Sequence, residues 1–194
     1  MNFYQLLKLI PKKIKFIKCH QRQISPEKIE ILAENLVKRL KKRKLFLAIM
    51  ESCTGGGLAN TITNVVGASD VFKGGFVTYS NQEKIRRGVP KKIIDKYSVY
   101  SPEVAVSMAY RAIKEIKGTD IGIGITGTLS RQDPKNPKSI IGQVYLAVVF
   151  KNKFLVRCFL LPNLKRSIVK LIIIQQALNL INKIINYGQH LVHL

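Results

Sequence analysis

The chain has 194 residues, of which 46% are hydrophobic, and its 33 Lys/Arg against 11 Asp/Glu give a formal net charge of +22. This length suits one domain with a real core and argues against a second independent domain. Such a charge is typical of proteins that bind nucleic acid or acidic membranes. However, residues 1–44 hold 13 Lys/Arg and three Glu, a net +10, and the remainder carries the other +12, so the charge forms no single stripe. A genome-wide compositional bias toward Lys, Ile and Asn explains it equally well.

Cysteine usage and hydropathy indicate a cytoplasmic protein. Cys19, Cys53 and Cys158 are too few and too scattered for a disulfide framework or a Cys-rich metal site, which fits a reducing compartment. The most apolar late segment, residues 168–185, is interrupted by two lysines, two glutamines and two asparagines. We therefore expect a well-buried helix there and no transmembrane segment.

The first elements in chain order are a basic extension and a helix. Residues 1–25 are expected to form a loosely ordered, solvated tail, with a basic amphipathic arm or a targeting extension as alternatives. Ser25 can cap a helix whose first residue is Pro26. Apolar residues recur at helical spacing after it, and the run "KRLKKRK" places cations at the negative end of that helix.

Strands and helices alternate through the middle of the chain. Residues 45–50 form a continuous apolar strand, the glycines that follow open a helix through about Val66, and "GGFVTYS" is a second strand. A helix starting at Ser101 runs to Gly118, and "TDIGIGITG" is a strand with small residues on one side. This alternation predicts a layered α/β domain with a mixed sheet.

The last elements are a hairpin and a long helix. "GQVYLAVVF" and "FLVRCFLL", joined through Asn152 and Lys153, are predicted to pair, and the C-terminal helix closes the domain. We divide the chain into the basic extension 1–25, the domain 26–187 and a tail 188–194.

Several familiar catalytic motifs can be set aside. His20, His190 and His193 all lie outside the predicted core, so neither a Ser-His-Asp triad nor a His-rich zinc site has local candidates. Gly122, Gly124 and Gly127 match G-x-G-x-x-G, but a loop rather than a helix follows them, whereas a dinucleotide fingerprint needs strand, glycines and helix in that order. "SIVK", residues 167–170, matches S-x-x-K without its companion motifs and is treated as accidental.

The turn "ESCTGGG", residues 51–57, has the right context for a functional site. A polar turn between a buried strand and a helix presents side chains where α/β ligands bind, and the helix N-terminus offers N–H groups to an anion. The alternative is a tight turn in which Ser52 or Thr54 merely caps the helix. If Ser52 is a nucleophile it needs a base, and histidine is absent from the predicted core.

The polar end of the next strand supplies candidates for that base. These are Tyr79, Ser80, Asn81 and, slightly beyond them, Lys84. A lysine can serve if burial, or the neighbouring residues 86 and 87, both arginines, depress its pKa. The alternative for Lys84 is an ordinary solvated helix residue.

Several blocks in order resemble the CinA C-terminal domain family, the nicotinamide-nucleotide amidases. They are "ESCTGGGLANTITNVVGASDVFKGGFVTYSNQEKIRRGVP", "VYSPEVAVSMA" and "DIGIGITGT", and the resemblance covers roughly residues 26–187. It implies a three-layer α/β/α domain, often oligomeric, that hydrolyses nicotinamide mononucleotide to nicotinate mononucleotide and ammonia without a metal or other cofactor.

The same resemblance implies the roles of individual residues. Ser52 matches the family's proposed nucleophile, and Tyr79 and Lys84 match its "TYSN..K" block. Together with the spacing arguments above, this gives a catalytic set of Ser52, Tyr79 and Lys84. The predicted substrate-binding set is Thr54, Gly55, Gly56, Ser80, Asn81, Thr126, Gly127 and Arg166.

Two departures from the family pattern lie near the expected site. Where many members have a Gly-rich loop, this chain has "TLSRQDPKNPKSIIG", a variant also found in stand-alone members. The family's "GDR" before the last helix is "LKR", which leaves Arg166 but loses the Gly and Asp.

The expected mechanism is acyl transfer. Ser52 attacks the amide carbonyl, Lys84 or Tyr79 accepts its proton, and N–H groups of the turn stabilise the oxyanion. Arg166 or the helix N-terminus would hold the substrate phosphate. The expected partners are a mononucleotide and further copies of the chain. A catalytically weak protein that binds nucleotides or nucleic acid through the basic arm is the alternative.

Overall fold

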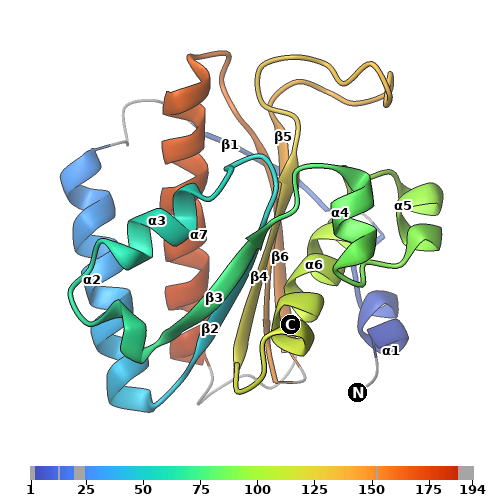
Figure 1. The fold of residues 1–194 in the computed structure, drawn as a ribbon. Helices are drawn as coiled ribbons and strands as arrows, with labels where there is room; N and C mark the ends of the chain where they lie inside the picture. The colour runs from blue at the N-terminus through green and yellow to red at the C-terminus, as the bar shows by residue number, and fades with distance from the viewer. Residues whose placement is uncertain (1–2, 13, 20–24, 152, 188–194) are drawn as a thin grey trace.

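Figure 1 shows the computed structural model of the chain, which describes residues 3–12, 14–19, 25–151 and 153–187. One six-stranded sheet lies at its centre. The strands found in these residues are β1 (Phe16–Lys18), β2 (Leu47–Glu51), β3 (Phe72–Val77), β4 (Ile121–Gly127), β5 (Gln143–Phe150) and β6 (Lys153–Leu160).

Helices occupy most of the remaining chain. They are α1 (Phe3–Lys8), α2 (Pro26–Arg43), α3 (Gly57–Thr63), the 3-10 turn η2 (Ala68–Asp70), α4 (Asn81–Arg86), α5 (Lys91–Tyr97), α6 (Pro102–Glu115) and α7 (Arg166–Tyr187). The predicted helices, strands and hairpin are all present, and Ser25 caps α2 by accepting from the Lys28 N–H. The sequence analysis missed α1, β1, α4 and α5.

The sheet has the order β1-β6-β5-β4-β2-β3 and is mixed, as predicted. Strand β2 pairs parallel with both β3 and β4, whereas β5 pairs antiparallel with both β4 and β6. Parallel strands place their carboxyl ends at the same sheet edge, so β2 and β4 end side by side.

Helices cover both faces of the sheet, which gives the three layers visible in Figure 1. On one face α2, α3 and α7 bury a core with Leu47 and Ile49 of β2. On the other face α1, α5 and α6 pack against Ala48 and Met50 of the same strand. Alternate residues of a strand point to opposite faces, so the apolar run 47–50 of β2 is what a sheet covered on both sides requires.

The long C-terminal helix α7 is a core element. Its length and composition would also suit a membrane span. In this fold, however, its apolar side chains, among them Ile173, Ala177 and Ile181, are fully buried in the core shared with α2 and the sheet.

The small residues of β4 allow α6 to lie directly on the sheet. A Cβ atom at Gly122 would lie 2.0 Å from the Ala109 carbonyl oxygen, and one at Gly124 would lie 2.0 Å from that of Ala105. Real Cβ atoms essentially never approach so closely. These two glycines of the G-x-G-x-x-G match therefore serve helix packing.

The connections around β2 create the edge at which a ligand can bind. The chain leaves β2 through α3 on one face to reach β3, and it returns through α4, α5 and α6 on the other face to reach β4. Strands β3 and β4 flank β2 on opposite sides. In open α/β sheets, ligands bind outside the carboxyl ends of strands at such a switch point.

The N-terminal extension corrects the prediction of a loosely ordered tail. Phe3, Leu6 and Ile10 are buried against the α6 side of the sheet, and β1 adds a parallel strand to β6 with Phe16 opposite Cys158. The apolar residues of α1 have helical spacing, but the segment is short and its flanking lysines concealed the pattern. Residues 20–24 and the predicted tail 188–194 lie outside the described residues.

Two leucines in this segment test whether α1 is packed on the domain. Leu6 is 2% exposed and Leu9 is 61% exposed. We expect Leu6→Ala to lower the free energy of unfolding by about 2–3 kcal/mol, since it leaves a cavity, and Leu9→Ala to change it by less than about 0.5 kcal/mol. Urea unfolding followed by circular dichroism measures both, and equal effects would contradict the packing.

Candidate active site

Ser52 lies at the carboxyl end of β2, directly after Glu51. Its N–H donates to the Ile125 carbonyl of β4 at 3.0 Å, which fixes it against the neighbouring strand. Gly55 and Gly56 then adopt φ values of 64° and 88°, and this left-handed conformation turns the chain into α3. The result is a rigid turn that holds a nearly buried serine hydroxyl at the sheet edge.

The buried carboxylate of Glu51 closes the N-terminus of α3. It accepts the N–H of Leu58 at 3.1 Å and that of Ala59 at 2.9 Å. Neither Ser52 nor Thr54 caps the helix, so the simple capping alternative is wrong. The expectation that this helix N-terminus binds a phosphate is wrong for the same reason, because Glu51 already occupies these N–H groups.

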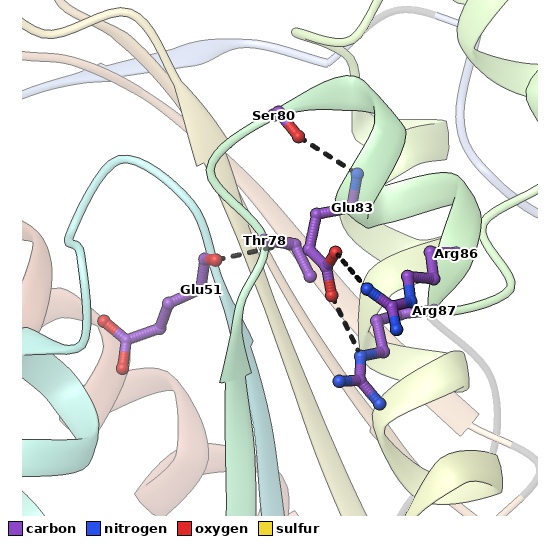
Figure 2. Close-up of polar contacts among 6 residues, drawn as sticks. All are labelled: Glu51, Thr78, Ser80, Glu83, Arg86 and Arg87. Carbon is purple, nitrogen blue, oxygen red and sulfur yellow. Dashed lines mark hydrogen bonds and ion pairs between the residues drawn. The ribbon is translucent and has the colours of Figure 1, made fainter.

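The segment after β3 is tied to the same strand end. Figure 2 shows the backbone carbonyl of Glu51 facing Thr78, whose N–H and hydroxyl donate to it at 2.8 and 3.3 Å. Ser80 then caps α4 by accepting the Glu83 N–H at 3.0 Å. Strand β3 ends at Val77, so the predicted site residues beyond it belong to the turn and the following helix.

Lys84 is fully buried on the inner side of α4 and contacts the serine. Its Nζ lies 3.1 Å from the Ser52 Oγ and 2.7 Å from the Thr78 carbonyl oxygen, and the residue is 1% exposed. Burial lowers the pKa of the Lys84 amine to about 8, although the nearby Cys53 has the opposite effect. Lys84 is therefore not a solvated surface residue but a partner of Ser52 that can be neutral near physiological pH.

The arginines after Lys84 do not cause this shift. Glu83 lies between them and pairs with Arg87 at 3.2 Å and with Arg86 at 3.9 Å, as Figure 2 shows. Arg87 also stacks on the Phe76 ring. Of the two causes expected for a lowered Lys84 pKa, burial is confirmed, and the contribution of Arg86 and Arg87 is wrong.

A cavity of about 270 Å³ opens beside Ser52. The lining residues are Ser52, Cys53, Tyr79, Tyr100, Gly127, Thr128, Leu129, Arg131, Gln132, Asp133, Pro134 and Arg166. Four of them were predicted site residues, namely Ser52, Tyr79, Gly127 and Arg166. Lys84 does not line the cavity but contacts Ser52 from inside the protein.

Tyr79 and Arg166 meet across the mouth of this cavity. Arg166 donates to the Tyr79 hydroxyl at 2.9 Å and to the Ser130 hydroxyl at 3.2 Å. Tyr79 is 62% exposed, so its phenol lies toward the entrance. In the described residues its hydrogen-bond partner is Arg166 rather than Ser52 or Lys84, an arrangement that suits substrate binding better than proton transfer.

The structure does not bring the other predicted binding residues to the cavity wall. Thr126 is buried and donates to the Val99 carbonyl at 3.0 Å. Ser80 and the adjacent Asn81 begin α4, and Gly55 and Gly56 form the turn, where Lys170 lies close to Gly55. The buried Thr54 hydroxyl has no hydrogen-bond partner in the described part of the chain.

The sequence analysis placed the loop after β4 near the site but named none of its residues as contacts, and it missed Tyr100. The signal was available, because "TLSRQDP" directly follows a strand that ends beside Ser52 and carries charged and amide side chains. The three histidines lie outside the described residues, so the structure does not place them.

Fold and site together define an α/β/α protein with a buried serine–lysine pair at the carboxyl edge of a mixed sheet. A family model described as the CinA C-terminal domain matches residues 29–185. The chain belongs to this family, as the sequence blocks indicated.

Relatives and solved structures agree with this assignment. The chain is 40% identical over 129 residues to a CinA-like protein of Kosmotoga olearia and 43% identical over 118 residues to one of Desulfovibrio desulfuricans. These alignments cover 66% and 60% of this chain but 31% and 27% of the relatives. The chain therefore spans less than a third of the length of these curated relatives.

Two crystal structures of the family share the fold. They are the competence/damage inducible protein CihA from Agrobacterium tumefaciens, with a TM-score of 0.76, and a CinA superfamily protein from Escherichia coli, with a TM-score of 0.77. Each is 27% identical to this chain and covers 84% of it, and 99% and 94% of the respective neighbours are matched. The predicted three-layer α/β/α architecture is confirmed.

The thiol beside Ser52 gives a testable contrast with the serine. Cys53 is 2% exposed, and burial raises its pKa to about 12. Because the thiolate is the reactive form, we expect iodoacetamide at pH 8 to label Cys53 slowly. Cys53→Ala should retain its fold and its cavity. Mass spectrometry of the native protein measures the labelling, and rapid alkylation of Cys53 would contradict a protonated, buried thiol.

Proposed function

We propose that this chain is an amidohydrolase that converts nicotinamide mononucleotide to nicotinate mononucleotide and ammonia, with Ser52 as nucleophile and Lys84 as general base. The observation that carries the proposal is the 3.1 Å contact between the Lys84 Nζ and the Ser52 Oγ in a site that excludes water from the amine. A serine needs an activating base, and a lysine can serve when its pKa falls toward the working pH.

The contacts of Lys84 suit proton transfer. When protonated, Nζ donates to both the Thr78 carbonyl and the Ser52 hydroxyl. When neutral, it can keep an N–H on Thr78 and present its lone pair to the hydroxyl proton of Ser52. The carbonyl thus fixes the amine in both protonation states.

The reaction then follows as two half-reactions. The Ser52 Oγ adds to the carboxamide carbon while Lys84 takes its proton, and Lys84 returns that proton to the nitrogen as the C–N bond breaks and ammonia leaves. Water attacks the resulting ester and gives a proton to Lys84. The bond to Oγ breaks, Oγ recovers the proton, and the carboxylate product is released.

Backbone N–H groups of the turn suit the developing oxyanion. In the described residues, the N–H groups of Cys53 and Thr54 donate to no backbone carbonyl, whereas those of Ser52 and Gly55 do. Free N–H groups beside the attacked carbon stabilise the negative charge of a tetrahedral intermediate.

The cavity fits a small anionic substrate. Its volume of about 270 Å³ lies just below the usual range for ligand pockets, which favours a mononucleotide over a larger dinucleotide. Arg166 and Arg131 line it and can bind phosphate oxygens. With the α3 terminus occupied by Glu51, these guanidinium groups are the candidates for holding the phosphate.

The direct test is ammonia release from nicotinamide mononucleotide by the purified protein. We expect turnover by the wild type and a fall of at least about 10³-fold in kcat for Ser52→Ala, with an unchanged circular dichroism spectrum. Cys53→Ala should keep most activity. Salt-dependent DNA binding without ammonia release would instead favour the nucleic-acid-binding alternative.

The lysine is tested by its variants and by pH. Activity should rise with pH through an apparent pKa of about 8 on the acid limb, because the neutral amine is the active form. Lys84→Met and Lys84→Arg should both lose about 10²–10⁴-fold in kcat, since arginine keeps the charge but cannot release its proton.

The matched control for these variants is Lys91→Met. That lysine is exposed and pairs with Asp95 on α5, so its replacement should leave activity unchanged. Wild-type activity in Lys84→Arg would reassign Lys84 to an electrostatic role and direct attention to Tyr79.

A further inference from the structure

The loop between β4 and β5 forms one wall of the cavity. It comes from a different part of the chain than the turn that carries Ser52. Leu129, Arg131, Gln132, Asp133 and Pro134 of this loop line the space beside Ser52. Because the loop lies far from β2 in sequence, its position depends on bonds that connect it to the rest of the domain.

Asp133 organises the loop internally. Its carboxylate accepts the Lys135 N–H at 2.9 Å and the Asn136 side-chain amide at 2.7 Å, and its own N–H donates to the Ser139 hydroxyl at 3.2 Å. Gln132 donates to two carbonyls on the far side of the loop. Asp133 therefore fixes the conformation of the residues on both sides of it.

Tyr100 connects this organised loop to the domain. Its hydroxyl donates to the Asp133 carboxylate at 2.9 Å. Tyr100 stands next to Ser101, the N-cap of α6, and Val99 on its other side accepts a hydrogen bond from Thr126 of β4. The phenol thus extends from a rigid segment, and burial raises its pKa, which keeps it a donor.

We propose that Tyr100 and Asp133 are positioning residues for substrate binding, whose hydrogen bond holds Arg131 and Gln132 at the cavity wall. The identity of the substrate rests on the proposed function. On the opposite side Arg166 bonds Ser130, so the loop is fastened to both helical layers. Arg131 and Arg166 then both line the cavity, where guanidinium groups can bind phosphate oxygens.

This arrangement predicts an effect on binding rather than on chemistry. Tyr100 and Asp133 bond to each other and have no hydrogen bond to Ser52 or Lys84 among the described residues. Ser52 and Lys84 bond to each other, and Lys84 also donates to the Thr78 carbonyl. A residue that supports ground-state and transition-state binding equally changes KM and leaves kcat unchanged.

The test compares Tyr100→Phe and Asp133→Asn with the control Tyr145→Phe. Tyr145 is a buried tyrosine with one side-chain partner, Gln143 at 3.2 Å, and it does not line the cavity. We expect Tyr100→Phe to raise KM for nicotinamide mononucleotide by roughly 3- to 10-fold, the range for one lost hydrogen bond, with kcat within about twofold. The control should keep both values.

Two further readouts separate positioning from a general loss of stability. Hydrogen–deuterium exchange should speed up in residues 129–141 of Tyr100→Phe and Asp133→Asn, with α2 and α7 unchanged. The double variant should raise KM by less than the two single effects combined, because both changes act on the Tyr100–Asp133 bond.

The outcomes distinguish the two proposals. If the wild type releases ammonia but Tyr100→Phe leaves KM and loop exchange unchanged, the positioning role is wrong and the proposed function stands. Additive effects of the two variants would also overturn the positioning role. If the wild type releases no ammonia, the proposed function fails, and equilibrium dialysis of nicotinamide mononucleotide decides the inference. Weaker binding by Tyr100→Phe then supports it, and unchanged or absent binding overturns it.

Discussion

The site depends on the cost of burying one amine. Lys84 lies inside the protein with a carbonyl and a hydroxyl as its hydrogen-bonding partners, and these compensate a positive charge poorly compared with water. Burial therefore lowers the pKa of the amine to about 8, which makes a lysine usable as a base where histidine is absent from the described core. The position of the amine is in turn set by Thr78, which the Glu51 carbonyl holds.

A second buried charge makes this arrangement rigid. Glu51 and Lys84 lie at the same end of β2, yet no ion pair joins them in the described residues, and each is matched to backbone dipoles instead. The carboxylate fixes the start of α3 and hence the turn that carries Ser52. No salt bridge breaks when the Lys84 ammonium loses its proton. Ser52 therefore keeps its position in both protonation states of the lysine.

The sequence was sufficient for what depends on local pattern. The order of the predicted strands and helices, the Ser25 cap and the position of Ser52 after a buried strand all followed from periodicity and turn residues, and the family blocks added the α/β/α architecture. The burial of Lys84 could only be suspected, because it depends on how α4 packs, and α4 was not predicted. The roles of Glu83 and Glu51 were also out of reach, since a carboxylate can pair with arginines or cap a helix with the same local sequence. Short apolar patterns, such as that of α1, are hidden when lysines surround them.

The closed form of the β4–β5 loop has a consequence for how the family can diversify. The Gly142 N–H donates to the Thr128 carbonyl at 2.8 Å, so the loop begins and ends at one point of the β4–β5 ladder. Several of its hydrogen bonds join residues of the loop to one another. A segment of this kind can be exchanged, lengthened or shortened without a change in strand register. Ser52, Lys84 and Glu51 lie outside it, so a different loop could change which ligands the cavity accepts while the buried serine–lysine pair stays the same.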